Sequence, residues 1–287
     1  MSDAWFIEKT APYGAAEDPC YPNEDGLYQD EDGSHPDETQ ALKDFCHEKT
    51  NAKQAAQAIT RPIENSKDPH ANLHRLWGLL IDALAELPAA QVPALIELLD
   101  AIQQLPEPHL AADQKKPAYG ALWRELSNFG HMWADEHKQY HRLEKLPAGD
   151  PANRADLRAK HARNAEVEAQ MVMANIGRIP IDWGYEGIAD ALERRNAVLD
   201  LEVPAAARWI AIAGKRLYAG AVNSEEIPDL ERRRDFGKQE KKMSLERWLF
   251  WEKRMEELFQ QSEATRNAAN AACSDMKVLR QDHDVSK

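Results

Sequence analysis

Three histidines stand close together in the segment HMWADEHKQYH, at positions 131, 137 and 141. On a helix, His137 and His141 project about 40° apart, so both can face one metal ion or one substrate. His131 lies six residues before His137 and faces another direction on a straight helix. Lys138 occupies the place of the glutamate in the HExxH pattern, which excludes zinc-protease chemistry of that kind. The pair therefore predicts either a catalytic or ligating site, or histidines that hydrogen-bond a neighbour at the edge of the core.

A second group of residues follows Asp182 at the start of a predicted helix: Trp183, Tyr185 and Glu186. A carboxyl group buried beside aromatic rings has a raised pKa and can act as a general acid or base. The alternative is a capped helix start with a packed aromatic side chain, where Glu186 faces water.

A third group lies on a predicted helix rich in alanine and glycine, which contains Arg208, Trp209, Lys215 and Arg216. Small residues allow close helix approach or border a cavity, and the basic residues can meet an anionic ligand. Close packing with solvated charges is the alternative. The catalytic candidates are His137, His141 and Glu186, and the ligand-binding candidates are Trp133, Tyr140, Trp183, Tyr185, Arg208 and Trp209.

Motifs for nucleotides and for prenyl diphosphate are absent from the sequence, so we expect no cofactor, and we assign no resident metal. The net charge of −13 comes from 36 basic and 49 acidic residues. Residues 1–40 carry eleven acids against Lys9 alone, which leaves the remainder close to neutral. This distribution argues against a nucleic-acid partner.

The three cysteines, Cys20, Cys46 and Cys273, lie far apart, as is typical of a protein from a reducing compartment. The first residues do not form a secretory signal, and no window approaches the ~18 apolar residues of a membrane span. We therefore expect a cytoplasmic protein that does not enter a membrane.

Apolar residues recur at helical spacing through most of the chain, and no segment alternates with the period of a strand. The sequence predicts an all-α fold: one globular domain of about seven or eight helices over 37–265. A disordered acidic arm is expected over 1–36, and the end of the last helix with a frayed tail over 266–287. The predicted helices cover 37–59, 70–87, about 93–105, 122–143, part of 150–179, 182–199, a segment opened by Pro204, and a long last helix capped by Ser244.

Four sequence blocks carry a resemblance to a known family: LWGLL at 76–80, IDWGYEGIADALE at 181–193, VPAAARWIAIAGKRLYA at 203–219 and SLERWLFWEKRMEEL at 244–258. Together they resemble a fungal group of all-helical proteins, the domain of unknown function numbered 3632, over about residues 70–260. The resemblance implies a fungal, soluble, helical protein and transfers no catalytic residue.

Two classes of function follow. The first is a helical protein that binds an apolar or aromatic small molecule in its core, which includes a cofactor-free enzyme of fungal metabolism. The second is a protein–protein interaction or regulatory protein without enzymatic activity. The eight tryptophans and the helix of small residues favour the first class. The oligomeric state does not follow from the sequence.

Overall fold

The computed structural model describes residues 3–10, 35–112, 114, 121–140, 151–232 and 241–285. Within these ranges the regular elements are helices, together with one isolated bridge between Glu226 and Lys242. The all-α class is confirmed, with eleven α-helices among the described residues in place of the seven or eight predicted. No helix in the described ranges is long and apolar enough to cross a membrane.

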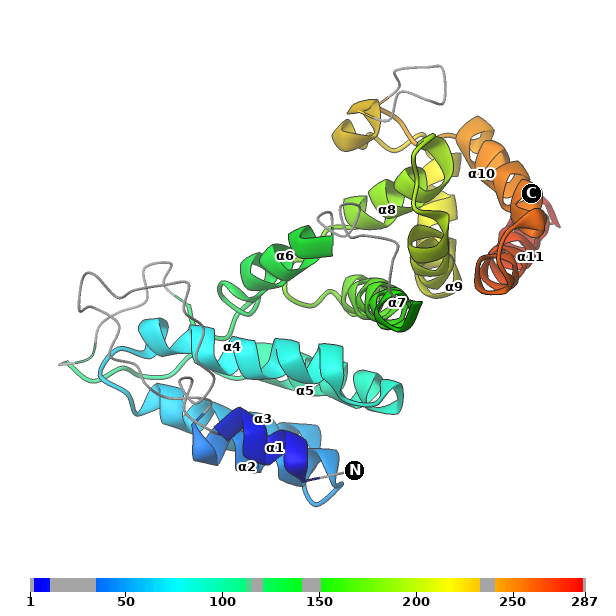
Figure 1. Cartoon of the computed structure of the whole chain (residues 1–287). Helices are drawn as coiled ribbons and strands as arrows, with labels where there is room; N and C mark the ends of the chain where they lie inside the picture. Colours follow the sequence, from blue (N-terminus) through cyan, green and yellow to red (C-terminus); the bar gives the residue numbers. More distant parts are fainter. Residues whose placement is uncertain are drawn as a thin grey trace, which may run out of the picture. The chain divides into compact units, whose positions relative to one another are not determined.

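The helices separate into two compact units, Met1–Asp135 and Glu136–Lys287. The first unit contains α1 (Ala4–Thr10), α2 (Pro36–Cys46), α3 (Ala52–Glu64), α4 (Pro69–Glu86), α5 (Val92–Gln103) and the first part of α6 (Phe129–Tyr140) (Figure 1). Its interior includes the buried Trp77, whose ring lies edge-to-face against Trp123 at 6.3 Å and against Phe129 at 5.7 Å. Each unit is described below by itself.

Local capping explains where the first unit departs from prediction. The predicted helix over 37–59 is two helices, because Asn51 starts α3 with a capping box in which Asn51 and Gln54 bind each other's backbone amides. The first turn of the predicted helix over 122–143 is a loop instead. There the carboxylate of Glu107 accepts the backbone N–H groups of Leu122 and Trp123, at 2.7 and 3.0 Å, so these amides are satisfied outside a helix.

The first ten residues also differ from the expected arm. Residues 4–10 form α1, which packs on α2 and buries Phe6. The rest of the predicted arm, from residue 11 to 34, lies outside the described residues.

The second unit is arranged around α9 (Leu199–Val222). Against it pack α7 (Pro151–Ala174), α8 (Asp182–Glu193), α10 (Leu245–Glu257) and α11 (Glu263–Val285) (Figure 1). Small residues permit close contacts in this bundle: the ring of Trp209 in α9 lies against Gly184 of α8, where a Cβ atom would come within 2.6 Å of the ring. The indole of Trp209 therefore leaves no room for a side chain at position 184.

The end of the chain folds back where one long helix was expected. Ser244 caps α10 as predicted, with its side chain accepting the N–H of Arg247. However, α10 ends at Glu257 and α11 is a separate helix that packs on α9 and α10. Ala269, Ala272 and Met276 of α11 are buried. The segment that was predicted to be the end of the last helix and a frayed tail therefore contributes to the core.

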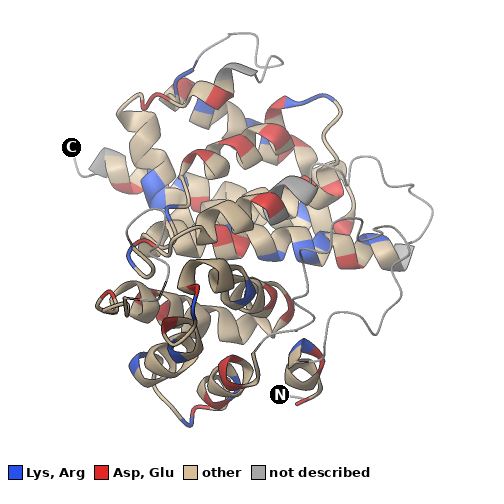
Figure 2. Cartoon of the chain, turned by 90° about the vertical axis from the view of Figure 1, so that its left-hand side faces the viewer, with Lys and Arg blue, Asp and Glu red and all other residues tan. Residues whose placement is uncertain are grey.

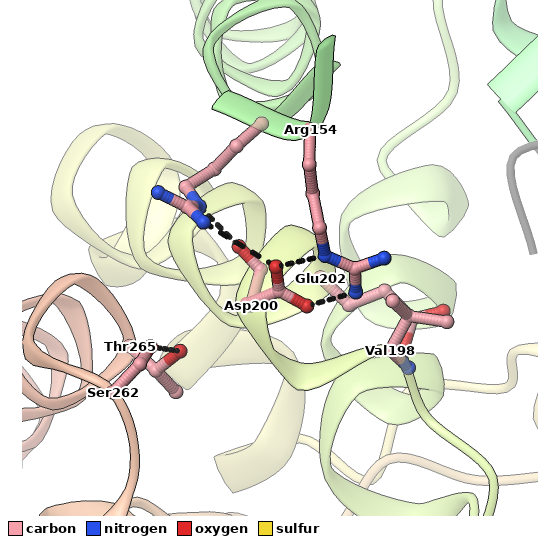
Figure 3. A network of polar contacts seen from close by, with 7 residues as sticks. Arg154, Val198, Asp200, Glu202, Ser262 and Thr265 are labelled. Atoms are coloured by element: carbon pink, nitrogen blue, oxygen red, sulfur yellow. Dashed lines mark hydrogen bonds and ion pairs between the residues drawn. The ribbon is translucent and has the colours of Figure 1, made fainter. Parts of the chain in front are cut away.

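Pro204 lies inside α9 rather than at its start. It lacks the N–H that would bind the carbonyl of Asp200 four residues earlier. That carbonyl accepts instead from Nε of Arg158 at 2.9 Å, while the Asp200 carboxylate binds Arg154 at 2.7 and 2.5 Å (Figure 3). Glu202 accepts the N–H of Val198 at the start of the helix, so two arginines of α7 and two carboxylates of α9, those of Asp200 and Glu202, hold the first turns of α9.

The Asp200 carboxylate makes stability depend on pH. The hydrogen bond from Arg154 holds the pKa of this carboxyl below its usual value. A depressed pKa contributes stability above the unfolded-state pKa of about 3.9, and the contribution is lost as the pH falls through the folded-state pKa. We expect Asp200→Asn to lower the urea midpoint at pH 7, and the gap to wild type to narrow below about pH 4. Asp156→Asn, at an exposed i,i+4 pair with Lys160, serves as the control and should change little. A gap at pH 3 equal to the gap at pH 7 would show that the carboxylate charge is not responsible.

Candidate functional site

A pocket of about 330 Å³ opens where the end of α8 faces α10. It is called the α8–α10 pocket below, and its lining residues are Leu192, Glu193, Arg194, Arg195, Phe250, Lys253, Arg254 and Glu257. The four residues from α10 follow a spacing of i, i+3, i+4 and i+7, so they share one helix face. This volume lies at the lower end of the range for small-molecule pockets.

Glu193, which lines the α8–α10 pocket, belongs to a buried ion pair. Both oxygens of Glu193 accept from Arg247, each at 2.7 Å, and Nε1 of Trp251 donates to the same carboxylate at 2.7 Å. The guanidinium also lies 3.4 Å from the carbonyl oxygens of Lys242 and Leu230. Arg247 is only 1% exposed. The pair fixes the end of α8 against α10 and adds no net charge to the pocket.

The rim of the pocket is cationic. Acidic and basic residues are interspersed along the described helices (Figure 2). At this rim, however, the cationic lining residues Arg194, Arg195, Lys253 and Arg254 outnumber the exposed carboxylate of Glu257. The rim is therefore locally positive in a protein whose net charge is −13.

Two of these arginines are held by protein contacts. Arg254 donates to the Leu192 carbonyl at 3.3 Å and to Glu257 at 2.6 Å. Arg194 lies 3.8 Å from Glu202, so it is tied to the first turns of α9. Arginine at a helix C-terminus balances the partial negative charge of the last carbonyls, which accounts for part of the positive rim.

One wall of the pocket is aromatic. Phe250 is half-buried and packs against the core of the second unit. Planar guanidinium groups bind carboxylate and phosphate oxygens in pairs, and an aromatic ring beside them stacks on an apolar group. This arrangement can hold an anion that carries an aromatic or apolar part.

Two of the predicted residues of α8 and α9, Tyr185 and Trp209, are part of the core. Tyr185 is fully buried, and its hydroxyl donates to Glu225 at 3.0 Å, while Arg216 binds the same carboxylate at 2.7 and 2.6 Å. Burial and the neighbouring Glu225 raise the pKa of Tyr185 well above its usual value, so its hydroxyl stays protonated. Trp209 is buried against Gly184. Tyr185 and Trp209 therefore come together in the same helix interface as packing residues.

The remaining predicted residues are scattered. Trp183 and Glu186 are half-buried on α8, and Arg208 is exposed, 3.7 Å from Glu166 of α7. Trp133 is fully buried in α6. The α8–α10 pocket is lined by none of the nine predicted site residues.

The histidine pair falls largely outside the description. His137 and Tyr140 lie in α6, but their side chains are outside the described part of the structure, and His141 is outside it entirely. The catalytic interpretation of His137 and His141 therefore stays a prediction.

The basic residues of the α8–α10 pocket can be recognised as a repeated pattern in the sequence. Two similar tripeptides, Glu-Arg-Arg at 193–195 and Glu-Lys-Arg at 252–254, each place two cations after a glutamate. One of these glutamates, Glu193, is the buried acceptor of Arg247, while Glu252 pairs with Arg280 at 3.0 Å. Only the contact between α8 and α10 shows that the two basic pairs border one pocket.

The first unit has pockets of its own, which are lined differently. Two pockets of about 510 Å³ each lie on either side of α3, and Arg61 lines both. The first also includes Glu64 and Glu107, whose carboxylates bind the side chain and backbone of Trp123. These acids are occupied by contacts that shape the loop, and we assign no chemistry to them.

Comparison with known proteins gives one match. A family model described as "Protein of unknown function (DUF3632)" matches residues 77–255. No curated protein and no solved structure matches the chain. The matched segment covers more than half of the 287 residues and includes the whole lining of the α8–α10 pocket except Glu257. The chain belongs to DUF3632, a family of proteins of unknown function.

Proposed function

We propose that the protein binds a small anionic molecule with an aromatic or apolar part in the α8–α10 pocket. The observation that carries the proposal is the group of four cationic side chains beside Phe250. The charge of Glu193, which also lines the pocket, is already neutralised by Arg247. The ligand would place its carboxylate or phosphate among the cations and its apolar part against Phe250.

The position of this site differs from the ligand site in the core that the sequence predicted. Trp133, Tyr185 and Trp209 are each buried and engaged in packing or hydrogen bonds, which favours the surface pocket over the core as the place for a ligand. The sequence predicted an apolar or aromatic ligand, and the ligand that we propose still has such a part because Phe250 supplies a ring at the pocket wall. The proposal that the ligand is an anion rests on the cationic residues of the pocket rim.

The cations differ in how accessible they are to a ligand. Arg254 binds Glu257, so an incoming oxyanion has to compete with that carboxylate. Arg195 and Lys253 are exposed side chains on opposite sides of the pocket, one after α8 and one on α10. Interactions of exposed charges are weakened by salt, so binding should be tighter at low ionic strength.

Probe binding tests the proposal. Phenyl phosphate should bind, whereas benzyl alcohol, which lacks the charge, and inorganic phosphate, which lacks the ring, should bind at least tenfold more weakly. The double variant Arg195→Gln/Lys253→Gln should lose at least tenfold in affinity for phenyl phosphate, since a hydrogen bond to a charged group contributes about 1.5–3 kcal/mol and about 1.4 kcal/mol is tenfold. Isothermal titration calorimetry measures these affinities.

A matched control removes the same charge elsewhere. Arg124→Gln/Lys160→Gln replaces two exposed cations that do not line the pocket, so phenyl phosphate should bind this variant as it binds wild type. Equal weakening in both double variants would mean that only the overall charge matters, and the pocket would be rejected as the site.

A second candidate function is protein binding through the outer face of α10. Leu245 and Leu249 are 39% and 48% exposed, and their i,i+4 spacing places them on one side of the helix. An acidic amphipathic helix is the kind of partner that such a face favours, with its carboxylates on the nearby cations. Loss of partner binding in Leu245→Ser/Leu249→Ser, with phenyl phosphate binding retained, would favour this candidate.

We also propose that the protein acts in the cytoplasm of a fungal cell. Cys46 and Cys273 are both free and buried, which supports a reducing compartment. Burial raises the pKa of the Cys46 thiol to about 11, so this thiol stays protonated and unreactive at neutral pH. Fluorescence microscopy of the tagged protein in a fungal host tests the location.

A further inference from the structure

Helix α1 is a seven-residue helix that contacts side chains of α2, of His47 and of α4. Phe6 is 3% exposed, and its ring lies 6.2 Å from the ring of His47, just after α2. Asp3, just before α1, pairs with Lys43 of α2 at 2.9 Å. An isolated helix of this length is not stable in water. The helical form of residues 4–10 therefore depends on docking.

A second set of contacts joins α1 to α4. Nζ of Lys9 lies 2.6 Å from the Asp82 carboxylate and 3.0 Å from that of Glu86. The indole of Trp5 donates to Glu86 at 2.7 Å, and the Lys9 ammonium lies 5.4 Å from the centre of the same indole ring. Trp5 and Lys9 are four residues apart, so together they present one polar edge of α1 to the acidic side of α4.

The opposite side of α1 is exposed. Ile7 is 67% exposed, and Glu8 is exposed as well. Recognition of α1 thus uses an aromatic residue, a neighbouring indole and a lysine four residues after the indole. This is the pattern of an amphipathic helix that lies in a groove.

The chain between α1 and α2 is long compared with the distance that docking of α1 has to cover. Residues 11–34 separate Thr10 from His35, a stretch of 24 residues. Such a stretch spans up to roughly 80 Å when extended, far more than docking requires. Because α1 belongs to the same chain as the surface on which it docks, its docking is intramolecular, and a separate helix has to compete with it.

We propose that the surface under α1, formed by Lys43 and His47 at α2 and by Asp82 and Glu86 of α4, is a docking groove for a short amphipathic helix, and that α1 is its exchangeable intramolecular occupant. The groove recognises one apolar aromatic side chain together with a Trp-x-x-x-Lys edge. While α1 is docked, a free helix of the same pattern has to compete against a tethered one. Release of α1 therefore opens the groove.

The experiment uses the full chain and a fluorescent peptide of residues 3–12. The full-length double variant Phe6→Ala/Lys9→Glu removes the buried ring and reverses the charge of α1, so its groove should be open. We expect the peptide to bind this variant at least tenfold more tightly than it binds the wild-type chain, in which tethered α1 competes. Fluorescence anisotropy measures both affinities, and 0.5 M salt should weaken binding to the variant.

Two controls make the result specific. The full-length variant Ile7→Ala keeps α1 docked and should bind the peptide as weakly as wild type does. Adding Asp82→Lys to the open variant should abolish binding of the natural peptide and restore part of the binding of a Lys9→Glu peptide. Circular dichroism confirms that each variant is folded.

Either of two results would overturn the proposal. A folded open variant that does not bind the peptide would mean that α1 is a fixed part of the first unit. Equal binding to wild type and to the open variant would mean that the peptide binds elsewhere.

Discussion

Replacing Glu193 by alanine is expected to destabilise the second unit by about 3–5 kcal/mol, because it leaves a buried arginine without its counter-charge. Arg247 is 1% exposed, and its two hydrogen bonds to Glu193 are each 2.7 Å long. The substitution also removes the acceptor of the Trp251 N–H. Urea denaturation followed by circular dichroism measures the change.

The double variant Glu193→Leu/Arg247→Met tests whether the loss of stability comes from leaving one buried charge without its partner. Exchanging a whole buried ion pair for apolar residues of similar size is often neutral or stabilising, so this variant should recover most of the loss. Lys160→Ala, at an exposed pair, should cost less than about 1 kcal/mol. If Glu193→Ala costs no more than Lys160→Ala, the buried pair does not hold α8 against α10.

The second large loss of stability is expected from Gly220→Ala, which adds one methyl group to α9. A Cβ atom at Gly220 would overlap the hydroxyl of Tyr185 and the carboxylate of Glu225. Gly220→Ala should therefore force apart the Tyr185–Glu225–Arg216 network, at a cost of about 1–3 kcal/mol for overpacking. Each hydrogen bond that is displaced adds about 1 kcal/mol. Thermal and urea unfolding should both show the loss.

Gly187 in α8 provides the matched comparison. Nothing lies within 4 Å of a Cβ atom there, so Gly187→Ala should stabilise the helix by about 0.5–1 kcal/mol. The two substitutions are chemically the same and differ only in what surrounds the added methyl group. A stabilising Gly220→Ala would show that Tyr185 and Glu225 move away without cost.

Local signals in the sequence were sufficient for several helices. The apolar stripe from Leu73 to Leu84 predicts a helix over 70–87, which agrees with α4 (Pro69–Glu86) within one residue at each end, and Ser244 marks the start of α10. These features depend on residues within a few positions of each other. The capping box of Asn51 and Gln54 is equally local, but the apolar spacing continues across it and predicts a single helix over 37–59.

Partner helices decide the features that the sequence did not reveal. The alanines of α11 have little apolar character of their own, and they are buried because α9 offers a face that includes Gly214, which Leu279 approaches closely. In the same way, Arg195 and Lys253 resemble ordinary solvated charges along the chain. They border one pocket only because the end of α8 faces α10.

Two of the aromatic residues that the sequence suggested for ligand binding pack in the core. Tyr185 and Trp209 are conspicuous in the sequence, yet both are buried packing residues. A large aromatic side chain contributes more to a helical core than to a pocket wall when a glycine such as Gly184 lies opposite. Phe250, which is half-buried, is less conspicuous and lines the pocket.

A crystal structure of the full chain with phenyl phosphate tests the proposed binding site most directly. We predict density for the phosphate within hydrogen-bonding distance of at least two of the four rim cations, with the phenyl ring against Phe250. The Glu193–Arg247 pair should remain unchanged beneath it. An empty α8–α10 pocket at saturating probe, or the probe bound in another place, would contradict the proposal.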